Sequence, residues 1–332
     1  MSNASVISRE ATGISRRMDS SDLEERQVVS GSIAILLCTM NGARFLPGQL
    51  ASFEAQDFSD WCLFASDDGS EDDTMVLLGE FQKKHGAHRV SIRRGPRRGY
   101  VANFLSLICD PALKSDYYAL SDQDDVWMAY KLSRARSFLM NAPADLPSLY
   151  CSQARLIDAQ GAVIGLPPIF KKAPCFQHAL VQNIAGGHTM VFNEEARSIF
   201  MKAGPDADAA VHDWWIYQAI TAVGGRVIYD PVPTVDYRIH GGNQIGAKRR
   251  AGVRNSQMLL NRFKHWNDLN IRALERIQSS MSEENKKVFD RFCRSRRSRL
   301  LPRIYWLLRS GIYREPKREN LNLMLAALLG KI

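Results

Sequence analysis

The sequence predicts an α/β fold with a mostly parallel central sheet, and three observations support this. Continuous apolar runs, typical of strands buried on both faces, recur along the first 120 residues. Each run is followed by a stretch with helical spacing, so the strands need crossover connections and pair in parallel. Polar side chains stand where the runs end, at the sheet edge where ligands bind. The four predicted strands are Ile33–Cys38, Trp61–Ala65, Arg89–Arg93 and Tyr117–Leu120.

The intervening helices are predicted from apolar periodicity. Phe45, Leu46, Leu50 and Phe53 recur at helical spacing, a helix with acidic residues at its start follows Ser70, and another lies near 102–109. Beyond a helix at 131–140 the pattern is less regular. It predicts short strands near Leu149 and Leu156, a glycine turn leading into a strand over 183–192, a helix from Val211 to about Val223, and strands at 227–229 and 234–238.

Length and composition fit one large α/β domain or two smaller ones. The chain has 332 residues, with 45% hydrophobic and 24% charged, which is ordinary for a globular protein. We expect a disordered leader at 1–31, rich in Ser, Arg and Glu, then an α/β domain at 32–246 and a basic helical extension at 247–332. Six scattered cysteines without metal-ligand spacing predict free thiols in a reducing compartment. No apolar run reaches about 20 residues and no apolar N-terminal region is present, which argues against a spanning helix or export.

The net charge of +9 belongs to the C-terminal part of the chain. From Ile245 onward there are 21 Lys or Arg and 7 Asp or Glu, whereas the preceding residues are mildly acidic. Arginines alternate with Leu, Ile, Tyr and Trp between Phe289 and Lys331. Two interpretations remain open at this point: helices that lie on an anionic membrane surface, or a helical cap packed on the α/β domain with a solvated basic face.

Three carboxylates gather within four residues after the fourth strand, at Asp122, Asp124 and Asp125. Their mutual repulsion is relieved by a divalent cation, and hard oxygen ligands suit Mg²⁺ or Mn²⁺. The alternative is a solvated acidic turn, and we expect Asp125 to cap the following helix. Thr39 and Asn41 follow the first strand and Asp67 and Asp68 the second, so these groups define one crevice. Phosphate-binding loops of the GxGxxG and GxxxxGK[ST] types are absent.

Five motifs in order resemble a known family. They are CTMNG, ASDDGSEDDT, LSDQDDVW, HDWW and YRIHGGN, and over Ser32–Gly246 they are similar to glycosyltransferase family 2 of the GT-A type. The likeness is strongest to bacterial rhamnosyltransferases of surface polysaccharide synthesis. The resemblance implies that Thr39 and Asn41 line the nucleotide pocket. It also implies that Asp68 accepts a hydrogen bond from the base, and that Gly99 and Asn103 lie against the nucleoside.

The same resemblance assigns the metal and catalytic positions. Asp122 and Asp124 match the DxD pair, with Asp124 as the direct ligand, and His240 stands where some members supply a metal or phosphate contact. Asp213 matches the catalytic carboxylate, although it would also be placed to cap its helix. His212 replaces the usual Glu, which leaves the partner of Asp213 open, and the resemblance assigns no role to His188. The QxxRW motif of processive synthases is missing, which favours transfer of a single sugar.

These expectations combine into an inverting, metal-dependent glycosyltransferase. One base with no second nucleophilic carboxylate implies single displacement, with Asp213 removing the proton of the acceptor hydroxyl. The donor would be a dTDP- or UDP-sugar, with L-rhamnose suggested by the resemblance alone. The acceptor would be a lipid-linked glycan or growing surface polysaccharide at the inner face of the bacterial plasma membrane, where a cytoplasmic enzyme would be peripherally bound.

Other functions were weighed against this one. A basic tail also suits a nucleic-acid-binding protein, but such a protein would carry basic and aromatic residues in the crevice, which is acidic. A sugar-1-phosphate nucleotidyltransferase needs a glycine-rich, basic loop after the first strand, and Thr39–Arg44 supplies none. A non-catalytic scaffold remains if the carboxylates bind no metal.

Overall fold

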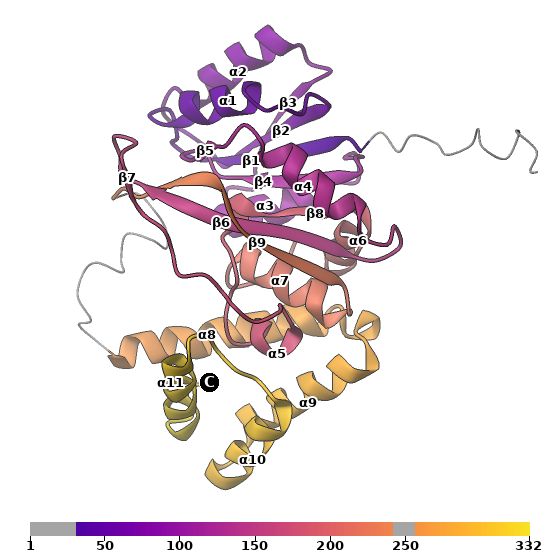
Figure 1. Ribbon diagram of the computed structural model, residues 1–332, viewed down its shortest axis with the longest axis vertical. Coiled ribbons are helices and arrows are strands. Elements are labelled where there is room, and N and C mark those ends of the chain that lie inside the picture. The colour runs from indigo at the N-terminus through magenta and orange to yellow at the C-terminus, as the bar shows by residue number, and fades with distance from the viewer. Residues whose placement is uncertain (1–30, 242–255) are drawn as a thin grey trace, which may run out of the picture. The chain divides into compact units, whose positions relative to one another are not determined.

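The computed structural model describes residues 31–241 and 256–332 (Figure 1). The predicted disordered leader therefore lies, apart from its last residue, outside the described residues. The predicted boundary between 246 and 247 also lies outside them.

The first half of the sheet consists of four parallel strands in the order β3-β2-β1-β4. These strands and their helices are β1 (Ile33–Thr39), α1 (Leu46–Glu54), β2 (Trp61–Asp67), α2 (Thr74–His85), β3 (Val90–Arg94), α3 (Tyr100–Ile108) and β4 (Tyr117–Ser121). Thr39 is in register with Asp67, so the polar ends of β1 and β2 lie side by side. The predicted strand and helix alternation is confirmed here.

The second half of the sheet is mixed, in the order β4-β8-β6-β9-β5 with β7 on β6. Its elements are β5 (Val126–Trp127), α4 (Lys131–Met140), β6 (Ser148–Ile157), β7 (Val163–Gly165), α5 (Phe176–Ala179), β8 (Val191–Asn193), α6 (Glu194–Ala203), α7 (His212–Ala222) and β9 (Arg226–Arg238). β6 and β9 are parallel, while β8 is antiparallel to both β4 and β6. Each of the two predicted pairs of short strands is one continuous strand, β6 and β9.

Helices cover both faces of the sheet (Figure 1). Side chains of β1 therefore alternate between two hydrophobic cores, one on each face. Ile35 and Leu37 join a cluster with residues of α1, α2 and α4. Leu36 and Cys38 join a larger cluster with α3, α6 and α7. Burial on both faces explains why the run in β1 is continuously apolar.

The larger core extends into the C-terminal helices, which are α8 (Ser256–Glu275), α9 (Glu283–Arg297), α10 (Leu300–Ser310) and α11 (Lys317–Leu328). Phe292, Leu307 and Leu323 are 1–3% exposed and belong to the same cluster as Trp215 of α7. These helices are therefore packed on the α/β part, as the cap interpretation expected. None of the helices within 31–241 and 256–332 is long and apolar enough to span a membrane. All six cysteines are free, as predicted.

Candidate functional site

The crevice is built at the carboxyl ends of β1, β2 and β4. Thr39 donates its hydroxyl to Asp67 at 2.8 Å, and Asp67 also accepts the backbone N–H groups of Gly69 and Ser70. Burial alone would raise the pKa of Asp67, but the hydrogen bonds, led by those from Ser70, lower it overall. Asp67 is thus a structural turn residue.

Asp68 organises the loop between β3 and α3. Its two carboxylate oxygens accept the backbone N–H groups of Arg97 at 2.6 Å and Gly99 at 2.7 Å. Gly99 has φ 87°, a left-handed conformation that glycine adopts without strain, and it begins α3. The carboxylate therefore fixes the loop, and its contact with a base N–H stays a prediction.

Two amide side chains predicted to contact the nucleotide hold the loops of the crevice together. Asn41 has φ 49° and accepts the backbone N–H of Glu71 at 2.8 Å. Asn103 is 1% exposed; it accepts the hydroxyl of Ser66 at 2.6 Å and donates to the Ser66 carbonyl at 2.8 Å. Their contribution to nucleotide binding stays a prediction, and the contacts here support the pocket walls.

The segment from Asp122 to Asp125 forms a tight turn between β4 and β5. Gln123 clips this turn to the end of β1, because its amide accepts the N–H of Met40 at 2.8 Å and donates to the Met40 carbonyl at 2.9 Å. Asp125 precedes a strand and not a helix, so its predicted capping role is wrong. It is fully buried and accepts the N–H of Arg238 on β9 at 3.1 Å.

A histidine missed by sequence reasoning lies directly beneath this turn. His188 Nδ1 is 3.6 Å from Asp122 Oδ2 and 3.7 Å from Asp125 Oδ2, and its ring stacks on Tyr237 at 4.6 Å. Candidate ligand atoms of Asp122, Asp125 and His188 all lie within 4.8 Å of one another. Asp125 Oδ2 has no hydrogen-bond partner among the described residues. This orphaned buried oxygen marks a place for a cation or a proton.

Asp122, Asp125 and His188, here called the inner cluster, shift one another's pKa values. Burial raises the pKa of Asp125 to about 8, opposed by His188 and reinforced by the neighbouring carboxylates. Burial would lower the pKa of His188, but Asp125 and Asp122 raise it overall. Lys131 is also fully buried and donates to the His188 carbonyl at 2.9 Å, and burial lowers its pKa to about 7. His188 is thereby held on both its ring and its backbone.

Asp124, in the same turn, is in contact with His240, the histidine that the motifs placed at the metal site. His240 Nε2 lies 2.7 Å from Asp124 Oδ2, although 116 residues separate them. Burial and the charge of Asp122 raise the pKa of Asp124, while His240 acts to lower it. The Asp124 and His240 side chains are 16% and 18% exposed and that of Asp122 is 36% exposed, so these three are more accessible than Asp125 and His188. The predicted proximity of Asp124 and His240 is present.

Asp213 lies in the first turn of α7, with its carboxylate directed to the glycine turn before β8. Its two oxygens accept the N–H groups of Gly187 at 3.1 Å and Trp214 at 2.6 Å. Burial raises the pKa of Asp213, although His212 and these two N–H groups act to lower it. His212 stacks on Phe104 at 4.1 Å, and neither ring nitrogen has a hydrogen-bond partner among the described residues. Burial lowers the pKa of His212, which favours an uncharged ring next to Asp213.

Tyr237 connects the two halves of the site. Burial raises the pKa of its phenol, and the charges of Asp125, Asp122, Asp124 and Asp213 add to this effect. Burial likewise raises the pKa of Tyr100, with Asp213 and Asp122 as the contributing charges. The glycine turn links these groups, because Gly187 donates its N–H to Asp213 and the next residue, His188, lies 3.6 Å from Asp122.

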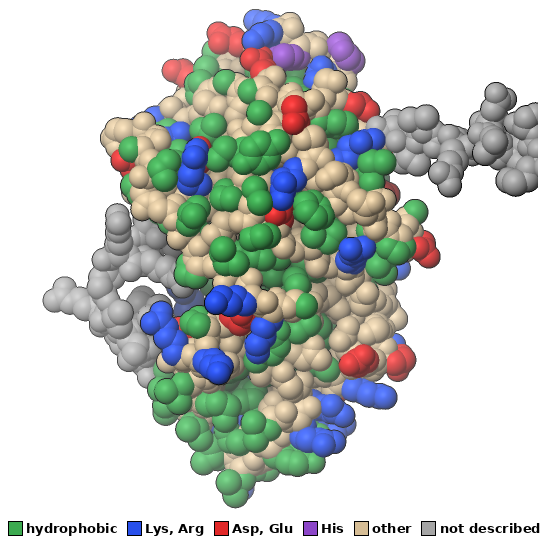
Figure 2. Space-filling model, viewed as in Figure 1, with side chains coloured by type: hydrophobic (Ala, Val, Ile, Leu, Met, Phe, Trp, Pro, Cys, Tyr) green, Lys and Arg blue, Asp and Glu red, His purple; other side chains and the backbone are tan. Residues whose placement is uncertain are grey.

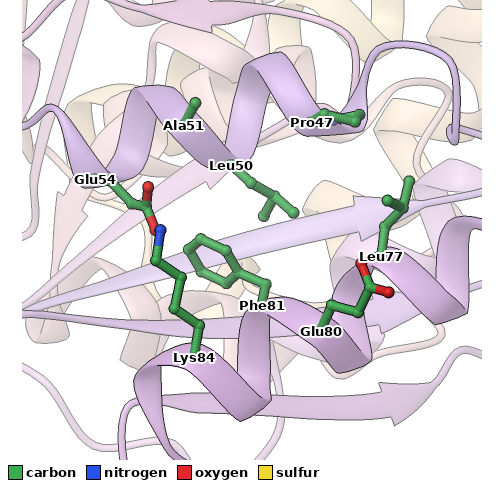
Figure 3. Close-up of a pocket in the computed structure, with 8 residues that line it drawn as sticks. All are labelled: Pro47, Leu50, Ala51, Glu54, Leu77, Glu80, Phe81 and Lys84. Atoms are coloured by element: carbon green, nitrogen blue, oxygen red, sulfur yellow. The ribbon is translucent and has the colours of Figure 1, made fainter.

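A second hollow lies on the outer surface between α1 and α2, with a volume of about 240 Å³ (Figure 3). Leu50, Leu77 and Phe81 form its floor, and Lys84 pairs with Glu54 at 2.6 Å along its rim. No predicted site residue lines it. The chemistry described above is therefore separate from this hollow.

Comparisons with known sequences agree with the geometry of the crevice. Residues 34–154 match the family model described as Glycosyl transferase family 2. The chain is also 29% identical over 228 residues to dTDP-rhamnosyl transferase RfbG of Shigella flexneri, which spans 64% of this chain and 74% of that protein.

Solved structures with the same fold include two glycosyltransferases. Residues 1–349 of S. aureus TarS in complex with UDP-GlcNAc match at TM-score 0.51 and 13% identity, over 85% of this chain and 93% of that one. GalNAc-T7 with UDP, GalNAc and Mn²⁺ matches at TM-score 0.51 and 12% identity, over 85% of this chain and 55% of that one. At these identities the structures establish the architecture. The chain is therefore similar to family 2 glycosyltransferases over residues 34–154, and it has the fold of these solved structures.

Proposed function

We propose that the protein transfers one sugar, L-rhamnose, from its dTDP-linked donor to a hydroxyl of a lipid-linked glycan or growing surface polysaccharide, with inversion and with a divalent metal. The observation that carries this proposal is that Asp213 and the Asp122–Asp125 turn meet at the glycine turn before β8. Asp213 accepts the N–H of Gly187, and the next residue, His188, lies 3.6 Å from Asp122. The sugar and nucleotide follow the RfbG relative. The acceptor and a position at the inner face of the plasma membrane follow the branch that the motifs resemble.

The donor would bind at the ends of β1 and β2. Thr39, Asn41 and Asp68 stand there on loops fixed by the bonds described above, and Gly99 and Asn103 close the adjacent side at the start of α3. TarS and GalNAc-T7, which share the fold, were crystallised with UDP-GlcNAc and with UDP. A loop held by backbone N–H bonds to a carboxylate is preorganised, which favours binding of a nucleoside without a large ordering cost.

Mg²⁺ or Mn²⁺ would be held by Asp124, Asp122 and His240, which present two carboxylates and an imidazole and are more accessible than Asp125 and His188. When bound, the ion supplies charge neutralisation for the leaving diphosphate. The inner set of Asp125 and His188 is 0–9% exposed and leaves little access for a diphosphate. We assign His188 the role of orienting Asp122 from below, as second-layer partners commonly do in metal sites.

Replacement of His188 by Ala is expected to raise the dissociation constant for Mn²⁺ by about 10- to 100-fold, as loss of a second-layer partner commonly does, and His240→Ala is expected to raise it further. Calorimetric titration of the full chain with Mn²⁺ measures both, with the exposed His88→Ala as a control. A larger effect from His188→Ala would place the ion among Asp122, Asp125 and His188 instead.

Asp213 would accept the proton of the attacking hydroxyl. Only its ionised form can do so, and burial raises its pKa above the ordinary carboxyl value of about 3.9. The kcat/KM profile is therefore expected to fall as pH drops through this raised pKa, with the acid limb above about pH 4. Below the pKa of the unfolded state the proton on Asp213 contributes fully to folding stability, and that contribution is lost as pH rises through the folded pKa. Steady-state rates between about pH 4 and 9 measure the limb, and a limb at or below the ordinary carboxyl pKa would contradict the assignment.

A thermal-shift panel of dTDP-, UDP- and GDP-sugars with and without Mn²⁺ tests the donor proposal. A ligand at about 100 times its dissociation constant stabilises by about 2.7 kcal/mol, which corresponds to a Tm rise of roughly 5–10 °C. We expect the largest rise with dTDP-rhamnose and Mn²⁺ together. A chain that shifts with none of these donors, or shifts equally without metal, would argue against metal-dependent transfer.

A further inference from the structure

The last two helices bury one face and leave a second apolar face exposed. In α10 Leu307 is 2% exposed, whereas Leu301 is 81% exposed. In α11 Leu323 is 3% exposed, whereas Leu321 is 73% exposed. Packing in the core thus accounts for only part of the apolar content of these helices.

The exposed apolar residues form a stripe along each helix. Leu301, Tyr305 and Leu308 on α10, and Leu321, Leu325 and Leu328 on α11, follow the spacing of one helix face. Together with Leu300 and Leu329 they are eight of the eighteen exposed large hydrophobic side chains in the described part of the chain. The helices are neighbours, because Arg303 on α10 donates to the Ala327 carbonyl on α11 at 3.1 Å. Figure 2 shows hydrophobic side chains gathered over α10 and α11.

Positive charge surrounds these stripes. Residues 291–332 contain eleven Lys or Arg and only two acidic residues, Glu315 and Glu319. Glu315 accepts two backbone N–H groups, from Lys171 and Lys172, and Glu319 lies 3.4 Å from Arg314. The exposed basic side chains on and beside the two helices are Arg294, Arg297, Arg299, Arg309, Lys317 and Arg318.

We propose that this surface, the α10/α11 face, docks on a bilayer that contains anionic phospholipid. Apolar side chains would enter the headgroup boundary while the flanking Arg and Lys pair with lipid phosphates. A second copy of the chain fits less well, because a twofold interface brings the same patch onto itself and would set Arg against Arg. The inference rests on the proposed function in one respect: it gives the enzyme a way to reach an acceptor carried on lipid.

Vesicle flotation of the full chain, without donor or acceptor, tests this surface independently of sugar transfer. Wild type is expected to float with vesicles containing about 30 mol% phosphatidylglycerol and to remain behind with pure phosphatidylcholine. The variant L301S/L308S/L321S/L325S is expected to lose binding by at least about tenfold. The variant R309Q/K317Q/R318Q should bind less, and added salt should weaken wild-type binding, because headgroup attraction is screened.

Matched controls separate the α10/α11 face from general surface stickiness. V76S/L166S removes two side chains that are each 58% exposed elsewhere on the chain, and it should float like wild type. All four proteins should melt at similar temperatures, since the substituted side chains are exposed. Equal flotation of wild type and the stripe variant would overturn the proposal. So would a wild type that stays behind and sediments as a dimer which the stripe variant dissociates. Transfer to a water-soluble acceptor should be unchanged in the stripe variant, so a failed transfer assay would bear on the proposed function alone.

Discussion

Asp213→Asn is expected to lower the rate of sugar transfer by about 10²–10⁴-fold, the usual contribution of a general base, while donor affinity stays nearly unchanged. The side-chain amide introduced by this substitution cannot accept the proton of the acceptor hydroxyl. It can still accept one of the two N–H groups that Asp213 receives, from Gly187 and Trp214, so the local structure should persist. Initial rates with labelled donor measure transfer, and calorimetry with the donor measures binding.

The pattern across binding and rate decides what Asp213 does. A similar loss in donor affinity would make it part of the donor pocket, and an unchanged rate would leave it as a helix-terminal residue only. Asp206→Asn is a suitable control, because that side chain is 65% exposed and pairs with Arg98 on the surface. Since burial raises the pKa of Asp213, the neutral Asn should not lower the Tm at pH 8.

Phe292→Ala is expected to reduce the free energy of unfolding by about 3–5 kcal/mol, as large-to-small changes in a packed core do. Phe292 of α9 is 1% exposed and lies in the same cluster as Trp215 of α7 and Leu274 of α8. Its loss should therefore destabilise the whole α/β unit. Urea unfolding followed by tryptophan fluorescence measures the change.

Leu308→Ala is the matched comparison, because this side chain is 66% exposed and should alter stability by no more than about 0.5 kcal/mol. If Phe292→Ala had an equally small effect, the C-terminal helices would be a separable appendage. Because buried residues of the C-terminal helices belong to the core, point substitutions of exposed residues test membrane binding without unfolding the chain. Deleting everything after Phe289 would remove Phe292, Leu307 and Leu323 from the core.

The first four strands were predictable because their signal is local. β1 is apolar throughout since both of its faces are buried, and the following helix repeats its apolar residues at helical spacing. β9 was predicted as two strands because Pro231 and Pro233 read as breaks. In the structure the pairing of β6 with β9 shifts register at Gln153, opposite Pro233, and this irregularity lets one strand pass through the prolines. α6 was missed although Asn193 caps it, with its side chain accepting the N–H of Ala196.

Site residues within recognisable motifs could be predicted from the sequence. Residues placed by contacts between segments far apart in the chain could not. Asp124 and His240 were each predicted from a motif as metal ligands, and in the structure the two side chains are in contact. Asp125 was misread because β5, only two residues long, exists through its pairing with Asp236 and Val235 on β9. The residues around Asp125 give no indication that this segment pairs with β9. His188 was left without a role for the same reason, since its neighbours Asp122 and Tyr237 come from the turn after β4 and from β9.

The clip between Gln123 and Met40 constrains how this crevice can vary. A Cβ added at Gly42 would lie 2.1 Å from Gln123 Oε1, so a larger residue there would have to displace the glutamine from its hydrogen bonds to Met40. Positions 42 and 123 should therefore covary among related enzymes, with a shorter side chain at 123 wherever 42 is not glycine. A relative that changed only one of them would lose the tether that joins the Asp122–Asp125 turn and the loop after β1 into a single mechanical unit.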